Sequence, residues 1–340
     1  MIEAHTLDAW TRWPDKTGRL YSYGTVLGGF AAPLFLWLAG IGVALSAAAL
    51  HRRALSRAGV IEAVARRGLE IFILAFLFRL QAFIVSPGSY PVTLFRVDIL
   101  NVMGPAIVAA GLVWGLSRRV PILVAAYAGL ALACAMVTPL ARTWGGVDRL
   151  PLWLQWYVRP AGDYTTFTMF PWAGFVFAGA AYGVVIASAK DERTERLAHA
   201  VLAAGGAAVV ALGFITAARP SIYAQSSFWT SSPTYFAIRV GVLMIGLALL
   251  TVVVKAMEGR GLRLVALDRF GRSSLFIYWI HVELVYGYAT WPIRQRLPLW
   301  GSALAFVVFV MLMYGAVLLR DRVVEAWRDA RVYGARDLPA

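Results

Sequence analysis

The chain has 340 residues, of which 60% are hydrophobic and 15% are charged, and its mean hydropathy is +0.68. A soluble protein of this length needs more polar surface, so the apolar excess predicts contact with lipid. The formal net charge is +14, but the arginines lie in short groups between apolar runs and form no basic face, so nucleic-acid binding is not expected. The one cysteine, Cys134, excludes an internal disulfide and a cysteine-based metal site.

Nine apolar runs approach the length of a membrane span, which is about 20 residues. They cover residues 26–50, 68–85, 98–116, 120–139, 169–188, 198–217, 236–256, 273–290 and 299–319. Several are short, as helix tilt and local thinning of the bilayer permit. Because these runs leave no room for a second, soluble domain, we predict an all-α, polytopic membrane bundle of about nine spans that forms one domain over residues 1–340.

Alternate loops differ in their content of basic residues, and one set carries most of the 32 lysines and arginines. Cytoplasmic loops of membrane proteins are the basic ones. This rule places residues 1–25 outside the membrane and makes residues 320–340 a cytoplasmic tail. The outer segments are rich in tryptophan and tyrosine, which indicates an interfacial belt or, as the alternative, stacking platforms for sugar rings.

The first ten residues do not resemble a signal peptide, because no arginine-rich region with a following apolar stretch and cleavage site is present. An external N-terminus without such a signal would be explained by a missing upstream span. In that case the bundle would have ten spans, with both termini in the cytoplasm.

Ionisable residues inside spans are costly and need partners. At about 1.5 Å per helical residue, Arg79 and Glu283 both lie roughly 15 Å deep in their spans. We therefore predict that they form a buried charge pair. Glu70 lies near the inner end of its span, one turn after Arg66, and is expected to pair there.

Two histidines are candidates for chemistry. His5 and Asp8 are three residues apart and share a helix face, so the carboxylate could orient the imidazole as a general base requires. His281 lies in the eighth apolar run, where it is either a second polar group of a site or a core histidine bonded to a neighbouring carbonyl. Further polar candidates at the outer start of the third run are Arg96, Asp98 and Asn101.

Four stretches carry a resemblance to a known family. They are residues 28–40 (GGFAAPLFLWLAG), 96–104 (RVDILNVMG), 170–179 (FPWAGFVFAG) and 270–283 (FGRSSLFIYWIHVE). In this order they resemble the membrane acyltransferases related to heparan-alpha-glucosaminide N-acetyltransferase, within the wider acyltransferase-3 group. Each motif is apolar and unspecific by itself, so the specificity comes from finding all four in the same order over nearly the whole chain.

The resemblance implies an activity and roles for particular residues. In that family the first span carries an arginine eleven residues before a histidine; Met1-x-x-x-His5 fits the end of this pattern, and the arginine would precede residue 1. The implied reaction moves an acyl group from cytoplasmic acyl-CoA to a sugar amine or hydroxyl on the outer side. His5 would be the base, Asp8 its orienting group and His281 a second polar group. Inner arginines could hold the phosphates of CoA, or serve only as topology signals: Arg52, Arg53, Arg269 and Arg272.

The implied partners are the lipid bilayer, acyl-CoA (acetyl-CoA first among them) as a co-substrate, and a glycan or lipid-linked sugar as acceptor. No bound cofactor and no metal are implied. We expect a multi-pass protein of a bacterial inner or plasma membrane with a cytoplasmic C-terminus. Two alternatives remain at this point: a secondary transporter or permease that uses the same charges in its spans, and a catalytically inactive accessory relative.

Overall fold

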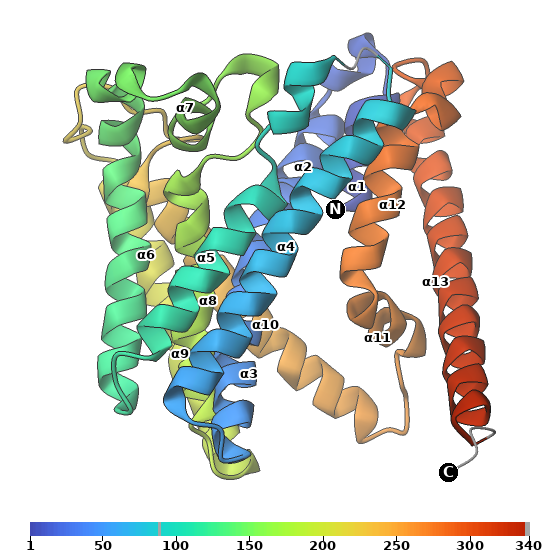
Figure 1. Cartoon of the computed structure of the whole chain (residues 1–340). Coiled ribbons are helices and arrows are strands. Elements are labelled where there is room, and N and C mark those ends of the chain that lie inside the picture. The colour runs from blue at the N-terminus through green and yellow to red at the C-terminus, as the bar shows by residue number, and fades with distance from the viewer. Residues whose placement is uncertain (88–89, 337–340) are drawn as a thin grey trace. The chain divides into compact units, whose positions relative to one another are not determined.

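The computed structural model describes residues 1–87 and 90–336 of the chain. Within these residues the chain forms thirteen α-helices, five short 3₁₀ helices and no β-strand beyond two isolated bridges (Figure 1). In this described part of the chain, seven helical segments are long and apolar enough to cross a membrane, and two shorter apolar helices, Ile99–Trp114 and Ser274–Tyr286, complete the nine predicted runs. The prediction of an all-α, polytopic membrane bundle is confirmed.

The chain divides into two compact units that interleave in sequence. Unit 1 comprises Met1–Gly29, Ile84–Gly88 and Met257–Ala340, and unit 2 comprises Phe30–Phe83 and Ser89–Ala256. The prediction of one domain over residues 1–340 stays a prediction. Residues 337–340 of the predicted cytoplasmic tail lie outside the described residues.

Unit 2 is built mainly from long apolar helices. They are α3 (Ala31–Arg52), α4 (Arg57–Val85), α5 (Ile99–Trp114), α6 (Val120–Thr143), the short α7 (Leu152–Val158), α8 (Met169–Ala187), α9 (Glu192–Ala217) and α10 (Pro233–Glu258). Several of these helices begin with residues that favour a helix start. Pro121 and Pro233 lie in the first turns of α6 and α10, where the backbone N–H groups have no partner within the helix, so proline loses no hydrogen bond there. Asp191 precedes α9 and accepts a hydrogen bond from the backbone N–H of Thr194 at 2.8 Å.

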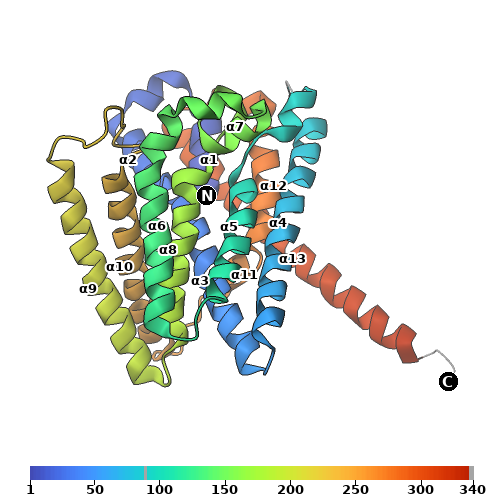
Figure 2. The same ribbon diagram turned by 60° about the vertical axis from the view of Figure 1, so that its left-hand side comes forward.

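Glycines set the contacts between these helices. A Cβ atom on Gly40 of α3 would lie 1.9 Å from the carbonyl oxygen of Val176 in α8, and one on Gly179 of α8 would lie 1.9 Å from that of Trp37. Lipid provides no hydrophobic force between spans, so they associate through close packing of their backbones at small residues. Glycine pairs also join α4 to α5 and α9 to α10 (Figure 2): Gly68 with Gly104, and Gly206 with Gly241.

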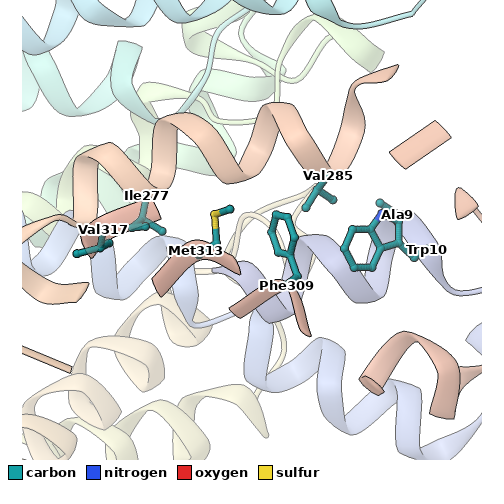
Figure 3. Packing of buried hydrophobic residues seen from close by; sticks show 7 residues of the cluster. All are labelled: Ala9, Trp10, Ile277, Val285, Phe309, Met313 and Val317. Atoms are coloured by element: carbon teal, nitrogen blue, oxygen red, sulfur yellow. The ribbon is translucent and has the colours of Figure 1, made fainter. Parts of the chain in front are cut away.

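Unit 1 contains α1 (Ile2–Trp10), α2 (Arg19–Gly28), α11 (Val265–Arg272), α12 (Ser274–Tyr286) and α13 (Leu299–Arg336). Its buried apolar cluster combines side chains of α1, α12 and α13 (Figure 3): Ala9, Trp10, Ile277, Val285, Phe309, Met313 and Val317. The indole of Trp10 meets the ring of Phe309 edge-on, with ring centroids 5.4 Å apart. This cluster packs the first helix of the chain against two of the last.

Backbone hydrogen bonds fix where α1 ends. The carbonyls of Ala9 and Trp10 accept from the N–H groups of Gln295 at 2.9 Å and Leu297 at 3.0 Å, and the N–H of Arg12 donates to the carbonyl of Leu297 at 2.9 Å. These bonds satisfy carbonyls that the helix end leaves unpaired. They also set the register of α1 against the segment before α13, and with it the position of His5.

The α3–α8 contact provides a test of the packing. We expect Gly40→Ala and Gly179→Ala each to destabilise the protein by at least about 1–3 kcal/mol, because the added methyl group meets a backbone carbonyl that cannot move aside. Gly42→Ala, on the same helix as Gly40, is the matched control, since a Cβ atom there has no neighbour within 4 Å. Thermal unfolding in detergent micelles measures the difference; an equal loss in all three variants would contradict this account of the contact.

Candidate functional site

His5 and Asp8 are joined by a third residue. The hydroxyl of Tyr286, at the end of α12, lies 3.2 Å from Nδ1 of His5 and 2.9 Å from Oδ2 of Asp8. The rings of His5 and Tyr286 also meet edge-on, with centroids 5.5 Å apart. The carboxylate and the imidazole are thus linked through a tyrosine that sequence reasoning did not single out, and the role of Asp8 in orienting a base stays a prediction.

His281 lies beside His5 in unit 1. Its side chain is 0% exposed, and its ring centroid is 5.3 Å from that of His5. Nδ1 donates to the carbonyl of Ile277 at 2.6 Å, which is the bond expected of a core histidine. A carbonyl only accepts, so the proton of the neutral ring is on Nδ1 and Nε2 carries a lone pair. This Nε2 is buried and has no hydrogen-bond partner among the described residues.

Lys16 is a second group of the site that sequence reasoning missed. Its ammonium donates to the backbone carbonyl of Asp8 at 2.6 Å and lies 3.5 Å from Oδ1 of the same residue. It also lies 4.9 Å from the centroid of the Trp13 ring. Lys16 therefore balances the charge of Asp8. No sequence pattern pointed to it, because the contact depends on how the turn after α1 folds back.

Arg79 pairs with Asp98 rather than with the predicted Glu283. Nη2 of Arg79 lies 2.6 Å from Oδ2 of Asp98, and both side chains are about nine-tenths buried, with 11% and 10% exposed. The prediction is corrected because depth along a span says nothing of the direction in which a side chain points. Glu283, 7% exposed, instead accepts a hydrogen bond from the hydroxyl of Ser86 at 3.3 Å. Both acidic groups thus have partners within their own units.

The other polar candidates brace the outer end of α5 in unit 2. Asn101 accepts the backbone N–H of Asp98 at 2.9 Å, and its amide lies within 3.4 Å of the hydroxyl of Tyr157. Arg96 donates to the hydroxyl of Thr166 at 2.8 Å. Each of these groups has a protein partner, so the arrangement is structural in character and lies in a different unit from His5.

The inner arginines lie at helix ends. Arg52 and Arg53 are exposed at the end of α3, whereas Arg269 and Arg272 belong to α11. Arg272 is engaged locally, with its Nε 3.0 Å from Asp268. A role for these side chains in binding CoA stays a prediction.

Glu70 meets Arg66 at 3.5 Å and Arg67 at 3.1 Å, which confirms its expected local pairing. Within the parts of the chain that the structure describes, no group of three or more His, Cys, Asp or Glu side chains could hold a metal ion.

These features define a multi-pass integral membrane protein in which two buried or half-buried imidazoles lie side by side within one helical unit. Residues 4–223 match the family described as heparan-alpha-glucosaminide N-acetyltransferase, catalytic. This is well over half of the chain, and the protein belongs to that family. It is therefore an N-acetyltransferase-like membrane protein.

The family match includes His5 but not His281. His5, Asp8 and Lys16 lie within the matched residues, as do three of the four stretches noted in the sequence, whereas residues 270–283 lie beyond its end. A comparison with curated protein sequences gives no match. The place of His281 and Tyr286 in the site consequently rests on geometry.

The Arg79–Asp98 pair provides a second prediction. Removing one partner leaves a buried charge without compensation, so Arg79→Gln should destabilise the protein by about 3–5 kcal/mol. Arg67→Gln on the same helix is the control, because its ion pair with Glu70 is about half exposed and is worth at most about 1 kcal/mol. Unfolding in detergent compares the two, and a loss for Arg79→Gln no greater than that for Arg67→Gln would refute the buried pairing.

Proposed function

We propose that this protein is an acyltransferase that moves an acyl group, with acetyl first among the candidates, from cytoplasmic acyl-CoA to an amine or hydroxyl of a sugar on the outer side of the membrane. The observation that carries the proposal is the pair of imidazoles of His5 and His281, with ring centroids 5.3 Å apart in a member of this family. Nδ1 of each ring is engaged by a protein group. Nε2 of each ring is therefore the atom left for a substrate.

The reaction requires little of the protein beyond a positioned base. The acceptor's nitrogen or oxygen attacks the thioester carbonyl carbon, a C–N or C–O bond forms, and the C–S bond of the thioester breaks. Nε2 of His5 takes the proton of the acceptor and passes it to the sulfur of the departing CoA, which leaves as a thiol. A neutral imidazole is suited to both halves of this transfer at neutral pH. Nε2 of His281 accepts a hydrogen bond from the same acceptor group and helps to orient it.

The chain's other two histidines are poorer candidates for the base. His51 is exposed at the end of α3 and packs its ring against Trp114, with centroids 5.7 Å apart. His199 is bonded through Nδ1 to the hydroxyl of Tyr182 at 2.7 Å, and its Nε2 lies 3.9 Å from Glu195. Neither is paired with a second imidazole. They serve as controls for the role of His5.

The orientation of the reaction follows from the distribution of arginines. Basic segments between spans face the cytoplasm, so in this proposal the C-terminus, the end of α3 with Arg52 and Arg53, and α11 with Arg269 and Arg272 lie on the cytoplasmic side of a bacterial inner or plasma membrane. Guanidinium groups suit the phosphates of CoA. The aromatic outer loops would then receive a glycan or a lipid-linked sugar.

The first experiment tests the base. The purified full chain in lipid nanodiscs is given acetyl-CoA and an amino sugar, and the release of the CoA thiol is followed with a chromogenic thiol reagent. His5→Ala should abolish release and leave acetyl-CoA binding close to that of the wild type, because a base acts in the chemical step. His51→Ala is the matched control and should retain the activity.

Two results would count against the proposal. One is a His5→Ala protein that still transfers the acyl group at the wild-type rate. The other is a wild-type protein that binds acetyl-CoA but transfers nothing to any amine or hydroxyl acceptor. The second result would favour a transporter or an accessory role, in which the same buried polar groups bind a solute without chemistry.

A separate experiment tests the orientation. In a Cys134→Ala background, Gly145→Cys should react with a membrane-impermeant maleimide applied to whole cells, whereas Glu192→Cys should react only after the cells are permeabilised. Both positions belong to unit 2. Gly145 follows the end of α6 and Glu192 follows the end of α8, so the two lie at opposite ends of the hairpin that α6 and α8 form. Reaction of both from the same side would overturn the predicted topology.

A further inference from the structure

We propose that Tyr286 is a positioning residue that fixes the proton of His5 on Nδ1, through a hydrogen-bond chain from His5 to Tyr286 to Asp8, and so keeps Nε2 free as the base. The inference rests on the proposed function for its catalytic consequence. Its structural content, the protonation state of one imidazole, is independent of any activity. Two distances carry it, 3.2 Å from His5 Nδ1 to the hydroxyl and 2.9 Å from the hydroxyl to Asp8 Oδ2.

The direction of the chain follows from counting protons. A tyrosine hydroxyl has one proton to donate, and an ionised carboxylate can only accept. At 2.9 Å from Oδ2, the hydroxyl of Tyr286 therefore donates to Asp8. Its oxygen is then an acceptor toward His5, so Nδ1 of His5 carries the proton of the neutral ring. If the hydroxyl instead donated its proton to Nδ1 of His5, the tyrosine oxygen and Oδ2 of Asp8 would face each other as two acceptors without a proton between them.

Lys16 lies beside Asp8, at the far end of this hydrogen-bond chain. Its ammonium lies 3.5 Å from Oδ1 of Asp8; the Lys16 side chain is 11% exposed, whereas that of Asp8 is 61% exposed and reaches water. Hydrogen bonds to an ionised acceptor are stronger than those to a neutral one. Lys16 thus stabilises the direction of the tyrosine proton without touching His5.

A single helix sets the protonation of both imidazoles. In α12, the carbonyl of Ile277 accepts the Nδ1 proton of His281 at 2.6 Å, and the hydroxyl of Tyr286 lies against Nδ1 of His5. Both rings thereby hold their proton on Nδ1 and present Nε2 as a lone pair. Tyr286 is fixed for this task by its edge-on packing against His5. The two Nε2 atoms are the proton acceptors of the site.

Loss of the hydroxyl should weaken catalysis without weakening substrate binding. Without an acceptor for Nδ1–H, His5 samples the tautomer with its proton on Nε2, which cannot act as a base. A hydrogen bond of this kind is worth about ten-fold in an equilibrium constant. Tyr286→Phe should therefore lower kcat about ten-fold and leave the KM for acetyl-CoA close to that of the wild type. Tyr288→Phe, at a side chain 60% exposed, is the matched control and should behave as the wild type.

A double variant separates positioning from simple packing. In Asp8→Ala the tyrosine keeps its proton but loses the carboxylate, so the hydroxyl turns to donate to Nδ1 and stabilises the wrong tautomer. Adding Tyr286→Phe removes that donor. The double variant should consequently be no slower than Asp8→Ala alone, whereas independent structural effects would add. Losses that multiply in the double variant would contradict the hydrogen-bond chain.

The tautomer itself can be observed. With only four histidines in the chain, ¹⁵N-histidine labelling and solid-state NMR in lipid resolve protonated from unprotonated ring nitrogens, and a His5→Gln sample assigns the signals of His5. Wild type and Tyr288→Phe should show His5 with its proton on Nδ1, and Tyr286→Phe should show a mixture of tautomers. An unchanged His5 spectrum in Tyr286→Phe would overturn the inference even if His5 proves to be the base. Conversely, full transfer by His5→Ala would overturn the proposed function and leave the NMR result standing.

Discussion

A polar group in a lipid-embedded helix bundle needs a hydrogen-bonding or charged partner within the protein, because the bilayer core contains no water that could take that partner's place. Much of the structure follows from this constraint. Arg79 binds Asp98 at 2.6 Å, Asp98 receives further support from Asn101, and Glu283 accepts a hydrogen bond from Ser86. The same constraint makes the exceptions informative, since a buried polar atom without a partner is costly to maintain.

The Nε2 atom of His281 is such an exception. It is buried without a partner among the described residues, while Nδ1 of the same ring is firmly bonded. Its neighbour His5 is engaged through Nδ1 by the hydroxyl of Tyr286. Two imidazoles arranged in this way can receive protons or hydrogen bonds from a ligand. This is the geometry that an acyl acceptor with an N–H or O–H group needs.

The position of His5 depends on how α1 packs against α2 and against the segment before α13. Because Gly24 and Gly28 of α2 have no side chains, α1 can approach α2 closely. A Cβ atom added to Gly28 would lie only 2.8 Å from the Cβ atom of Ala4. The backbone bonds of Ala9 and Trp10 then tie the end of α1 to the segment before α13. Because α12 precedes that segment, its residues His281 and Tyr286 arrive next to α1. Residues far apart in the sequence thus form one site through packing and backbone hydrogen bonds.

The sequence by itself determined the class of the protein and much of its span pattern, because apolar runs and arginine-rich loops are local features that lipid imposes directly. It also determined the family, through motifs in a fixed order, and the local pairing of Glu70 with the arginines one turn before it. His5, Asp8 and His281 could be singled out as well, since imidazoles and carboxylates are few in so apolar a chain.

Only the tertiary structure decided how these groups are connected. The partner of Arg79 depends on the direction of a side chain, which depth along a span does not specify, and so the sequence pointed to Glu283 instead of Asp98. Tyr286 and Lys16 carry no local signal, because a tyrosine near a helix end and a lysine in a turn are ordinary features of membrane proteins. Their hydrogen bonds to Asp8 exist because α1, α12 and the turn after α1 pack together. Such contacts depend on how the helices and the turn pack, and no pattern along the chain contains them.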